Sequence, residues 1–151
     1  MSTIQWTGNA HSVKQISTIT IANTWAAADT CTITINGKGE TNTIIQANAN
    51  PNTANYRIFY ISSGGNLTLD GLTIRNGRCI DACATLVNPG GGVYNAGTLT
   101  ITNSAFSGNS ANVGGGVYNQ GTLTIMNSTF SGNSATGSGG GVYHNLGALT
   151  I

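Results

Sequence analysis

Apolar and polar positions in the C-terminal part of the chain follow one pattern that occurs three times. Residues 91–111 recur almost unchanged as residues 115–135, and a third copy begins at Gly140. Equivalent apolar positions lie 24 residues apart, as Val93 and Val117 show (93 to 117). A fixed period of this length indicates a protein built from stacked structural repeats.

Short strands account for the apolar positions within each copy. In residues 98–102, leucine and isoleucine alternate with threonine, which is the period of a strand that buries one face. Asn, Gly and Ser separate the strands, and these residues tolerate the left-handed backbone of tight corners. We therefore predict an all-β fold, a right-handed parallel β-helix (solenoid) with about 24 residues per rung.

Equivalent apolar residues of successive rungs are expected to stack inside this β-helix. Hydrogen-bonded strands lie roughly 4.8 Å apart, so like residues should be in direct contact. Asn109 and Asn133 should form a hydrogen-bonded ladder at successive corners. The predicted inward columns are Val93, Val117 and Val142; Leu99, Leu123 and Leu149; Ile101, Ile125 and Ile151; and Phe106 with Phe130.

The repeats carry a pair of motifs that occurs in a known family. Each copy has the run Gly-Gly-Val, and residues 106–109 and 130–133 both read Phe-Ser-Gly-Asn. This pairing resembles the GGA[I/V] and FxxN motifs of the polymorphic outer membrane protein repeat family, although Gly92 stands where that motif has Ala. The resemblance implies a bacterial surface β-helix, often the passenger of an autotransporter, with an adhesin role.

The first 37 residues do not follow the 24-residue period. Residues 15–21 and 30–35 read as two alternating strands, and the β-helix is expected to begin near residue 32. We interpret residues 1–37 as an N-terminal β segment that caps the first rung, as solenoids need, or that exchanges a strand during assembly. Residues 38–151 then hold the parallel β-helix repeats.

An insertion that runs from Cys79 to Pro89 interrupts the regular spacing. Cys79 and Cys83 are four residues apart within it, and our first interpretation is a local disulfide. Free thiols and metal binding remain as alternatives, but no neighbouring His or further Cys completes a zinc set. Cys31 is then left over, and we expect it to be a small buried side chain.

The low charge of the chain limits its partners. Only 6% of residues are charged, and the formal net charge is +1. Nucleic acids and anionic membranes are bound through clustered basic residues, so we expect neither as a partner. No apolar run approaches the ~20 residues of a membrane span. Partners must be recognised through shape, hydrogen bonds and apolar contact.

Catalytic and metal sites have few candidate residues. Enzymes built on parallel β-helices need clustered carboxylates or calcium in one groove. None of the acids recurs at the rung spacing, and the glycine runs lack the Asp of calcium-binding repeats. We therefore expect no enzyme, metal or cofactor, with a polysaccharide-active enzyme as a distant alternative. The acids are Asp29, Glu40, Asp70 and Asp81, and the two histidines are His11 and His144.

One column of aromatic residues should lie on the outside of the fold. Tyr94, Tyr118 and Tyr143 each follow an inward valine and should therefore point outward. Such a ladder could stack on sugars or on another protein, and host or matrix glycans are possible ligands. The alternative is that the rings stack on one another and stabilise the sheet.

The last residues of the chain suggest a route to self-association. Leu149 and Ile151 are inward residues of a strand in mid-rung, and no polar capping repeat follows them. An open rung is a template for another strand, which the alternating residues Ile16, Ile19 and Ile21 of a second copy could supply. Contact between the end of one chain and the start of the next propagates as a fibre. The alternative is a truncation or a fragment of a longer protein.

Taken together, these patterns predict a non-enzymatic structural protein that is extracellular or on the bacterial cell surface. Its partner is expected to be itself, in a head-to-tail homopolymer that forms β-solenoid filaments or surface fibres. The alternative is a monomeric adhesin, or a carbohydrate-binding β-helix fragment of a larger surface protein.

Overall fold

The fold is all-β in the part of the chain that the structure describes. In the computed structural model, residues 31–151 are described except for 55, 81, 82 and 84–88, and strands and turns but no helix occur among them. Before residue 31 only the backbones of three short strands are described, as residues 2–5, 11–14 and 19–21. The predicted all-β class is confirmed for these residues.

Two long sheets contain most of the inward-facing leucine, isoleucine and phenylalanine. Sheet A has the strand order β1 (Ser2–Gln5), β4 (Cys31–Asn36), β7 (Gly65–Asp70), β11 (Thr98–Thr102), β15 (Thr122–Met126) and β19 (Ala148–Thr150). Sheet B has the order β2 (His11–Lys14), β5 (Thr43–Gln46), β8 (Thr73–Arg75), β12 (Ala105–Ser107) and β16 (Thr129–Ser131).

Two further sheets complete the described fold. Sheet C has the order β3 (Ile19–Ile21), β6 (Phe59–Ile61), β10 (Val93–Asn95), β14 (Val117–Asn119) and β18 (Val142–His144). Sheet D is shorter, with β9 (Arg78–Cys79), β13 (Ser110–Val113) and β17 (Ser134–Ser138).

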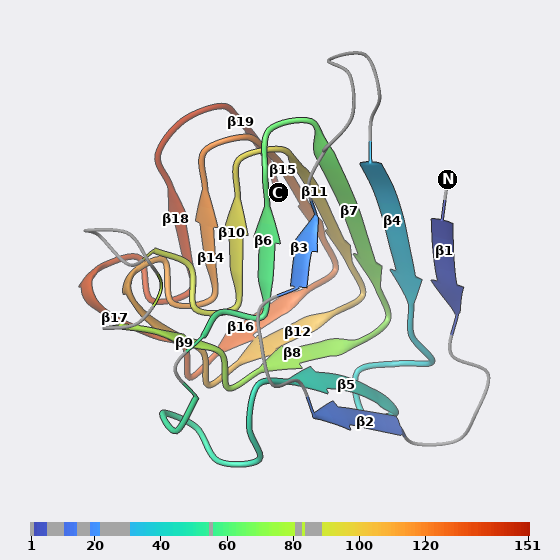
Figure 1. Cartoon of the computed structure of the whole chain (residues 1–151), viewed down its shortest axis with the longest axis horizontal. Helices are drawn as coiled ribbons and strands as arrows, with labels where there is room; N and C mark the ends of the chain where they lie inside the picture. The colour runs from blue at the N-terminus through green and yellow to red at the C-terminus, as the bar shows by residue number, and fades with distance from the viewer. Residues whose placement is uncertain are drawn as a thin grey trace.

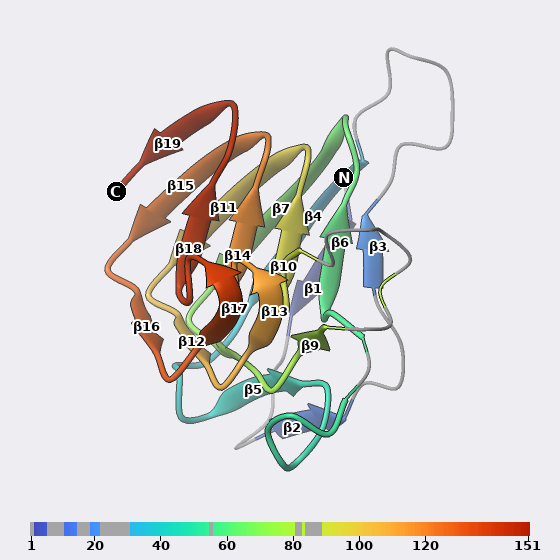
Figure 2. The same cartoon turned by 90° about the vertical axis from the view of Figure 1, so that its left-hand side faces the viewer.

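The chain visits the sheets in a fixed order. From β7 onward it runs through sheets A, B, D and C and then returns to sheet A, beside the strand that it left (Figure 1). Every pairing between these strands is parallel, as the aligned arrows of Figure 2 illustrate. We call each passage through the sheets a rung. A short strand in each sheet is thus paired with the equivalent strands of the rungs before and after it.

The register of these pairings confirms the predicted columns except at Ile151. Val93 lies opposite Val117, which in turn lies opposite Val142. Leucine, isoleucine and phenylalanine columns follow the same rule: Leu99, Leu123 and Leu149; Ile101 and Ile125; Phe106 and Phe130. Ile151, predicted to extend the isoleucine column, lies just past the end of β19 and is 86% exposed.

Burial follows the alternation of side chains along each strand. In β11, the two apolar residues are fully buried while the three threonines are half-buried. The Phe106 and Phe130 rings stack with centroids 4.9 Å apart, so that the core is continuous between rungs. Like apolar residues therefore pack against one another along the axis of the stack, as the 24-residue period predicts.

Corners between the strands use backbone conformations that few residues adopt. Asn103 and Asn127 have φ of 48° and 47° at equivalent corners, in the left-handed region that Asn tolerates. At Gly92 a Cβ atom would lie 2.5 Å from the carbonyl oxygen of Gly116 in the next rung, so a side chain there would prevent the rungs from approaching.

The N-terminal strands extend the same sheets. β1 pairs in parallel with β4, β2 with β5, and β3 with β6. The pairings thus begin before residue 32, where we expected the β-helix to start. β4 corresponds to the predicted strand at 30–35, and β3 to the end of the one at 15–21, of which residues 15–18 lie outside the described part. A role of residues 1–37 as cap or assembly segment stays a prediction.

Substitution of one inward residue and one outward residue tests the assignment of the two faces of sheet A. Leu123 is fully buried between Leu99 and Leu149, so Leu123→Ala should cost roughly 2 to 5 kcal/mol through the cavity that it leaves. Thr122→Ala, on the exposed face of the same strand, should cost less than ~1 kcal/mol. Denaturant unfolding measures both, and equal costs would contradict the assignment.

Candidate functional site

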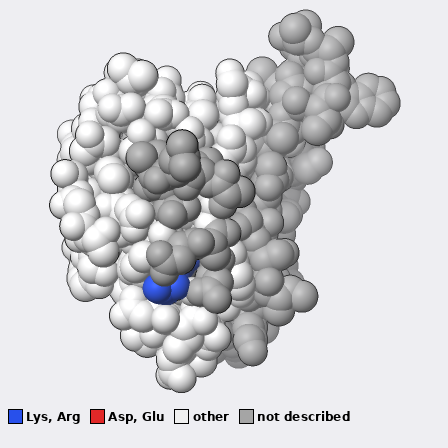
Figure 3. All heavy atoms as spheres, turned by 60° about the vertical axis from the view of Figure 1, so that its left-hand side comes forward, with Lys and Arg blue, Asp and Glu red and all other residues white. Residues whose placement is uncertain are grey.

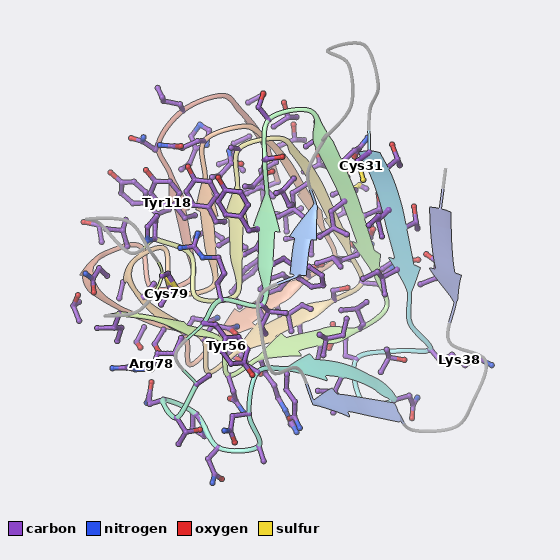
Figure 4. The ribbon with its side chains drawn as sticks, in the orientation of Figure 1. Cys31, Lys38, Tyr56, Arg78, Cys79 and Tyr118 are labelled. Carbon is purple, nitrogen blue, oxygen red and sulfur yellow. A yellow bond between two sulfur atoms is a disulfide. The ribbon has the colours of Figure 1, made fainter. Side chains whose placement is uncertain are left out.

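Four tyrosines form a continuous stack on sheet C. Tyr60, Tyr94, Tyr118 and Tyr143 occupy the same register position on successive strands. Their ring centroids lie 4.9, 5.4 and 5.5 Å apart, and the planes are within 15° of parallel. Figure 4 shows Tyr118 on the side of sheet C that is turned away from sheet A. The outward direction predicted for this column agrees with the view, and Tyr60 adds a ring that the sequence analysis missed.

The rings of this stack cover one another. Tyr118, in the middle, is only 7% exposed, whereas Tyr94 and Tyr143 are half-buried. The Tyr94 hydroxyl donates a hydrogen bond to Gln120 Oε1 at 2.6 Å, and Gln120 Nε2 donates to the Tyr118 hydroxyl at 3.0 Å. Of the two interpretations of the ladder, this geometry favours self-stacking, because the faces of the inner rings are not free to bind a sugar.

A buried arginine joins the tyrosine stack to the insertion. The Arg57 guanidinium lies 5.6 Å from the centre of the Tyr60 ring and 5.2 Å from that of Tyr94, a cation–π arrangement. Its Nη2 donates to Cys79 Sγ at 3.1 Å and to the Cys83 carbonyl at 3.3 Å. Arg57 thus holds the cysteine segment against the outer face of sheet C.

Burial in this cluster shifts the pKa of the arginine and the pKa of one tyrosine in opposite directions. Desolvation lowers the pKa of Arg57, and the neighbouring Tyr60 and Tyr94 oppose that change. Burial raises the pKa of Tyr94, Tyr60 and Tyr118 add to the rise, and the Arg57 cation opposes it. The face of the molecule in Figure 3 shows one basic spot and no acidic one among its described atoms.

The insertion carries the cysteine pair. Cys79, buried on β9, and Cys83 form a disulfide with their Cα atoms 5.4 Å apart. Cys31 is a free thiol at the start of β4, where it is partly exposed and packs against the edge of the core. We expected Cys31 to be buried, and its place on the first residue of a strand explains the remaining exposure.

Asparagine side chains form hydrogen-bonded ladders inside two of the corners. Asn109 Nδ2 donates to Asn133 Oδ1 at 2.9 Å, so the predicted ladder at this corner is confirmed. Asn95 Nδ2 donates to Asn119 Oδ1 at a second corner, in a ladder that the sequence analysis missed. Asn133 is partly buried, and the other three residues are fully buried: Asn95, Asn109 and Asn119. The recurrence of Asn after Val-Tyr in the first two copies of the repeat was the signal for the second ladder.

His144 takes the next position of the second ladder. It lies opposite Asn119 in the register, and its Nδ1 is 3.0 Å from Asn119 Nδ2. The register thus places the histidine itself, and not Asn145, in the asparagine column. Both ring nitrogen and amide can hydrogen-bond, so the ladder continues with a different side chain.

The described residues do not bring acidic or metal-binding side chains together. No group of three or more His, Cys, Asp or Glu residues occurs among them. Asp70 Oδ1 accepts a hydrogen bond from Asn103 Nδ2 at 2.9 Å on the surface, whereas Asp29 and Asp81 lie outside the described part of the chain. Within the same part, no helix has the length and apolar character needed to cross a membrane.

The residues predicted to mediate assembly lie at opposite ends of the stack of rungs. Leu149 is on β19, the last strand of sheet A, and is 38% exposed. Ile19 and Ile21 are on β3, the first strand of sheet C, where only the backbone is described. Ile16 lies outside the described residues. The two ends cannot meet within one chain, as Figure 2 illustrates.

Comparisons with protein-family models, curated proteins and solved structures returned no match to this chain.

The buried asparagine ladder should contribute to stability. In a double variant, Asn109→Leu with Asn133→Leu, several buried main-chain groups lose their hydrogen-bond partners, at ~1 to 3 kcal/mol for each such group. The melting temperature should therefore fall well below that of the parent. Asn145→Leu, at an exposed turn, is the control and should change it little. A double variant that melts like the parent would contradict a structural role for the ladder.

Alkaline pH should destabilise the fold through Tyr94. Its pKa is raised above the ordinary value of 10.0, so the folded chain holds the proton more tightly than the unfolded chain does. This contribution is complete below the unfolded pKa and is lost as pH rises through the folded pKa. Melting temperatures between about pH 8 and pH 11 should fall less steeply for Tyr94→Phe than for the parent. Thr122→Ala should keep the parent slope, and an unchanged slope for Tyr94→Phe would contradict the prediction.

Proposed function

We propose that the protein is a non-enzymatic structural scaffold, a right-handed parallel β-helix of about 24 residues per rung. The observation that carries this proposal is that equivalent side chains of successive rungs are in contact along one axis. Apolar residues, aromatic rings and asparagine amides each contact their equivalents in the next rung. Such a stack resists bending and unfolding through many small identical contacts, which suits a mechanical or spacing role.

The surface location is proposed from the motifs. The repeats resemble the polymorphic outer membrane protein repeat family, whose members are bacterial surface β-helices. The disulfide between Cys79 and Cys83 supports an oxidising, extracellular setting, because such bonds persist there. We therefore place the scaffold outside the cell or on a bacterial cell surface.

We further propose that copies associate head to tail through the open edge of the last rung. Among the described strands, the last one of each sheet has a neighbour on one side only: β16, β17, β18 and β19. Leu149 is 38% exposed and Phe130 is half-buried, whereas the equivalent Leu123 and Phe106 are fully buried. This apolar edge favours the addition of a parallel strand, and the segment that contains Ile16, Ile19 and Ile21 of a second copy is the proposed donor.

Charge placed in the junction tests head-to-tail assembly. The unmodified chain should sediment as species larger than a monomer at high concentration, and Leu149→Lys with Ile151→Lys should return it to a monomer. Thr98→Lys with Thr100→Lys adds the same charge on the outer face of β11, away from the edge, and should leave assembly intact. A monomeric parent, or fibres from the Leu149 and Ile151 variant, would contradict the proposal.

A second candidate function is a monomeric adhesin that binds host or matrix glycans. Tyr143 favours it, because among the described residues it stacks on Tyr118 alone and is only half-buried, so one ring face is open to a sugar. A glycan-array signal from a monomeric parent that disappears in Tyr143→Ala would favour this function over filament formation.

A further inference from the structure

Two corners of the fold follow one rule of hydrogen bonding between rungs. At the first corner, the Leu72 N–H donates to Ser104 Oγ at 3.3 Å, and the Ser104 N–H donates to Ser128 Oγ at 3.1 Å. Each serine hydroxyl in turn donates to the carbonyl two residues before it, at 2.7 Å and 2.8 Å. The hydroxyl proton is therefore occupied within its own rung, and the oxygen accepts from the preceding rung.

The second corner repeats this arrangement with asparagine. The Gly77 N–H donates to Asn109 Oδ1 at 2.9 Å, and the Asn109 N–H donates to Asn133 Oδ1 at 3.1 Å. The side-chain amides also donate to the preceding rung, to the carbonyls of Ile74 and Phe106 at 3.1 and 2.8 Å. Each Asn thus satisfies one donor and one acceptor of the rung before it.

At both corners, therefore, the later rung supplies the side chain and the earlier rung supplies the main chain. Leu72 and Gly77 begin the two columns and have no side-chain oxygen of their own. Their N–H groups donate to side chains of the next rung. In the β15–β18 rung, the Ser128 and Asn133 N–H groups have no acceptor among the described residues. These two donors lie at the same edge as the half-exposed Phe130 and Leu149.

We infer that this edge selects the polypeptide that docks on it: a parallel rung of the same repeat type, with Ser above Ser128 and Asn five residues later, above Asn133. The argument is continuity with the interfaces between the preceding rungs, where these two side chains make the same contacts twice. The inference rests on the proposed β-helix, and it specifies which side chains the partner of the open edge must carry.

The first rung of a second copy matches this edge less well. In the register of sheet B, the serine column continues through Thr43 to His11. A first rung docked on this edge would therefore place a histidine, and not a serine, above Ser128. A head-to-tail contact would pair the strands but would not reproduce both corner hydrogen bonds.

The experiment extends the full chain after Ile151 by a second copy of residues 126–150, which continues the register because Leu149 lies opposite Leu123. Amide hydrogen exchange then reads the Ser128 and Asn133 N–H groups directly. We expect each to exchange at least about tenfold more slowly than in the unextended chain, as one gained hydrogen bond implies.

Two variants of the extension isolate the corner contacts. With Ser128→Ala and Asn133→Leu made only in the appended copy, both amides should keep their fast exchange, or the appended rung should fail to pair with β19 at all. With Thr129→Ala and Ser131→Ala, the neighbouring exposed positions, the slow exchange should remain. The inference would be overturned if the Ser128 and Asn133 N–H groups exchanged slowly in both variants. It would also be overturned if they exchanged fast in the unsubstituted extended chain.

The same readout separates this inference from head-to-tail assembly. Sedimentation of the unextended chain tests head-to-tail assembly. Hydrogen exchange in the extended chain tests whether Ser and Asn of the docked rung accept the two corner hydrogen bonds. If self-association of the unextended chain slowed both amides as much as the extension does, the first rung would serve as well as a repeat rung, and the selectivity would be refuted.

Discussion

The main-chain hydrogen bonding between parallel strands of successive rungs is the constraint on which the other features of this structure depend. It fixes the spacing between rungs and places residue above residue in register. Once this is set, any side chain that recurs in the sequence must lie against its own copy. Valine, leucine and phenylalanine columns then fill the interior with no need for a helix or a second layer.

Corners pose the harder physical problem, because the strands end there and their N–H and C=O groups need other partners. The fold solves it with short polar side chains held inside. Asn95, Asn109 and Asn119 are fully buried, yet each amide is hydrogen-bonded to a neighbouring rung. An apolar residue of similar size would fill the space but leave main-chain groups without partners, which is why polarity is retained at these positions.

On the outer side of sheet C, the same register stacks tyrosine rings, and each inner ring is covered on both faces by its neighbours. Arg57 lies over two of the rings and contacts the disulfide-bonded segment. Structural and binding roles thus compete for the same side chains. The inner rings stack on one another, whereas Tyr143, at the end of the stack, stacks on Tyr118 alone among the described residues.

The sequence by itself determined what depends on exact repetition. The alternation in residues 98–102 predicted the β class. The 24-residue period predicted the inward columns and the ladder of Asn109 and Asn133, because strands of equal spacing can be aligned without knowing how the chain turns. Tertiary structure alone decided where the spacing is irregular: Tyr60 joins the tyrosine stack 34 residues before Tyr94 (60 to 94), and β1 to β3 extend the sheets. The physical reason is that insertions at corners change the distance along the chain without changing the register between strands, so hydrogen bonding restores an alignment that counting residues cannot recover.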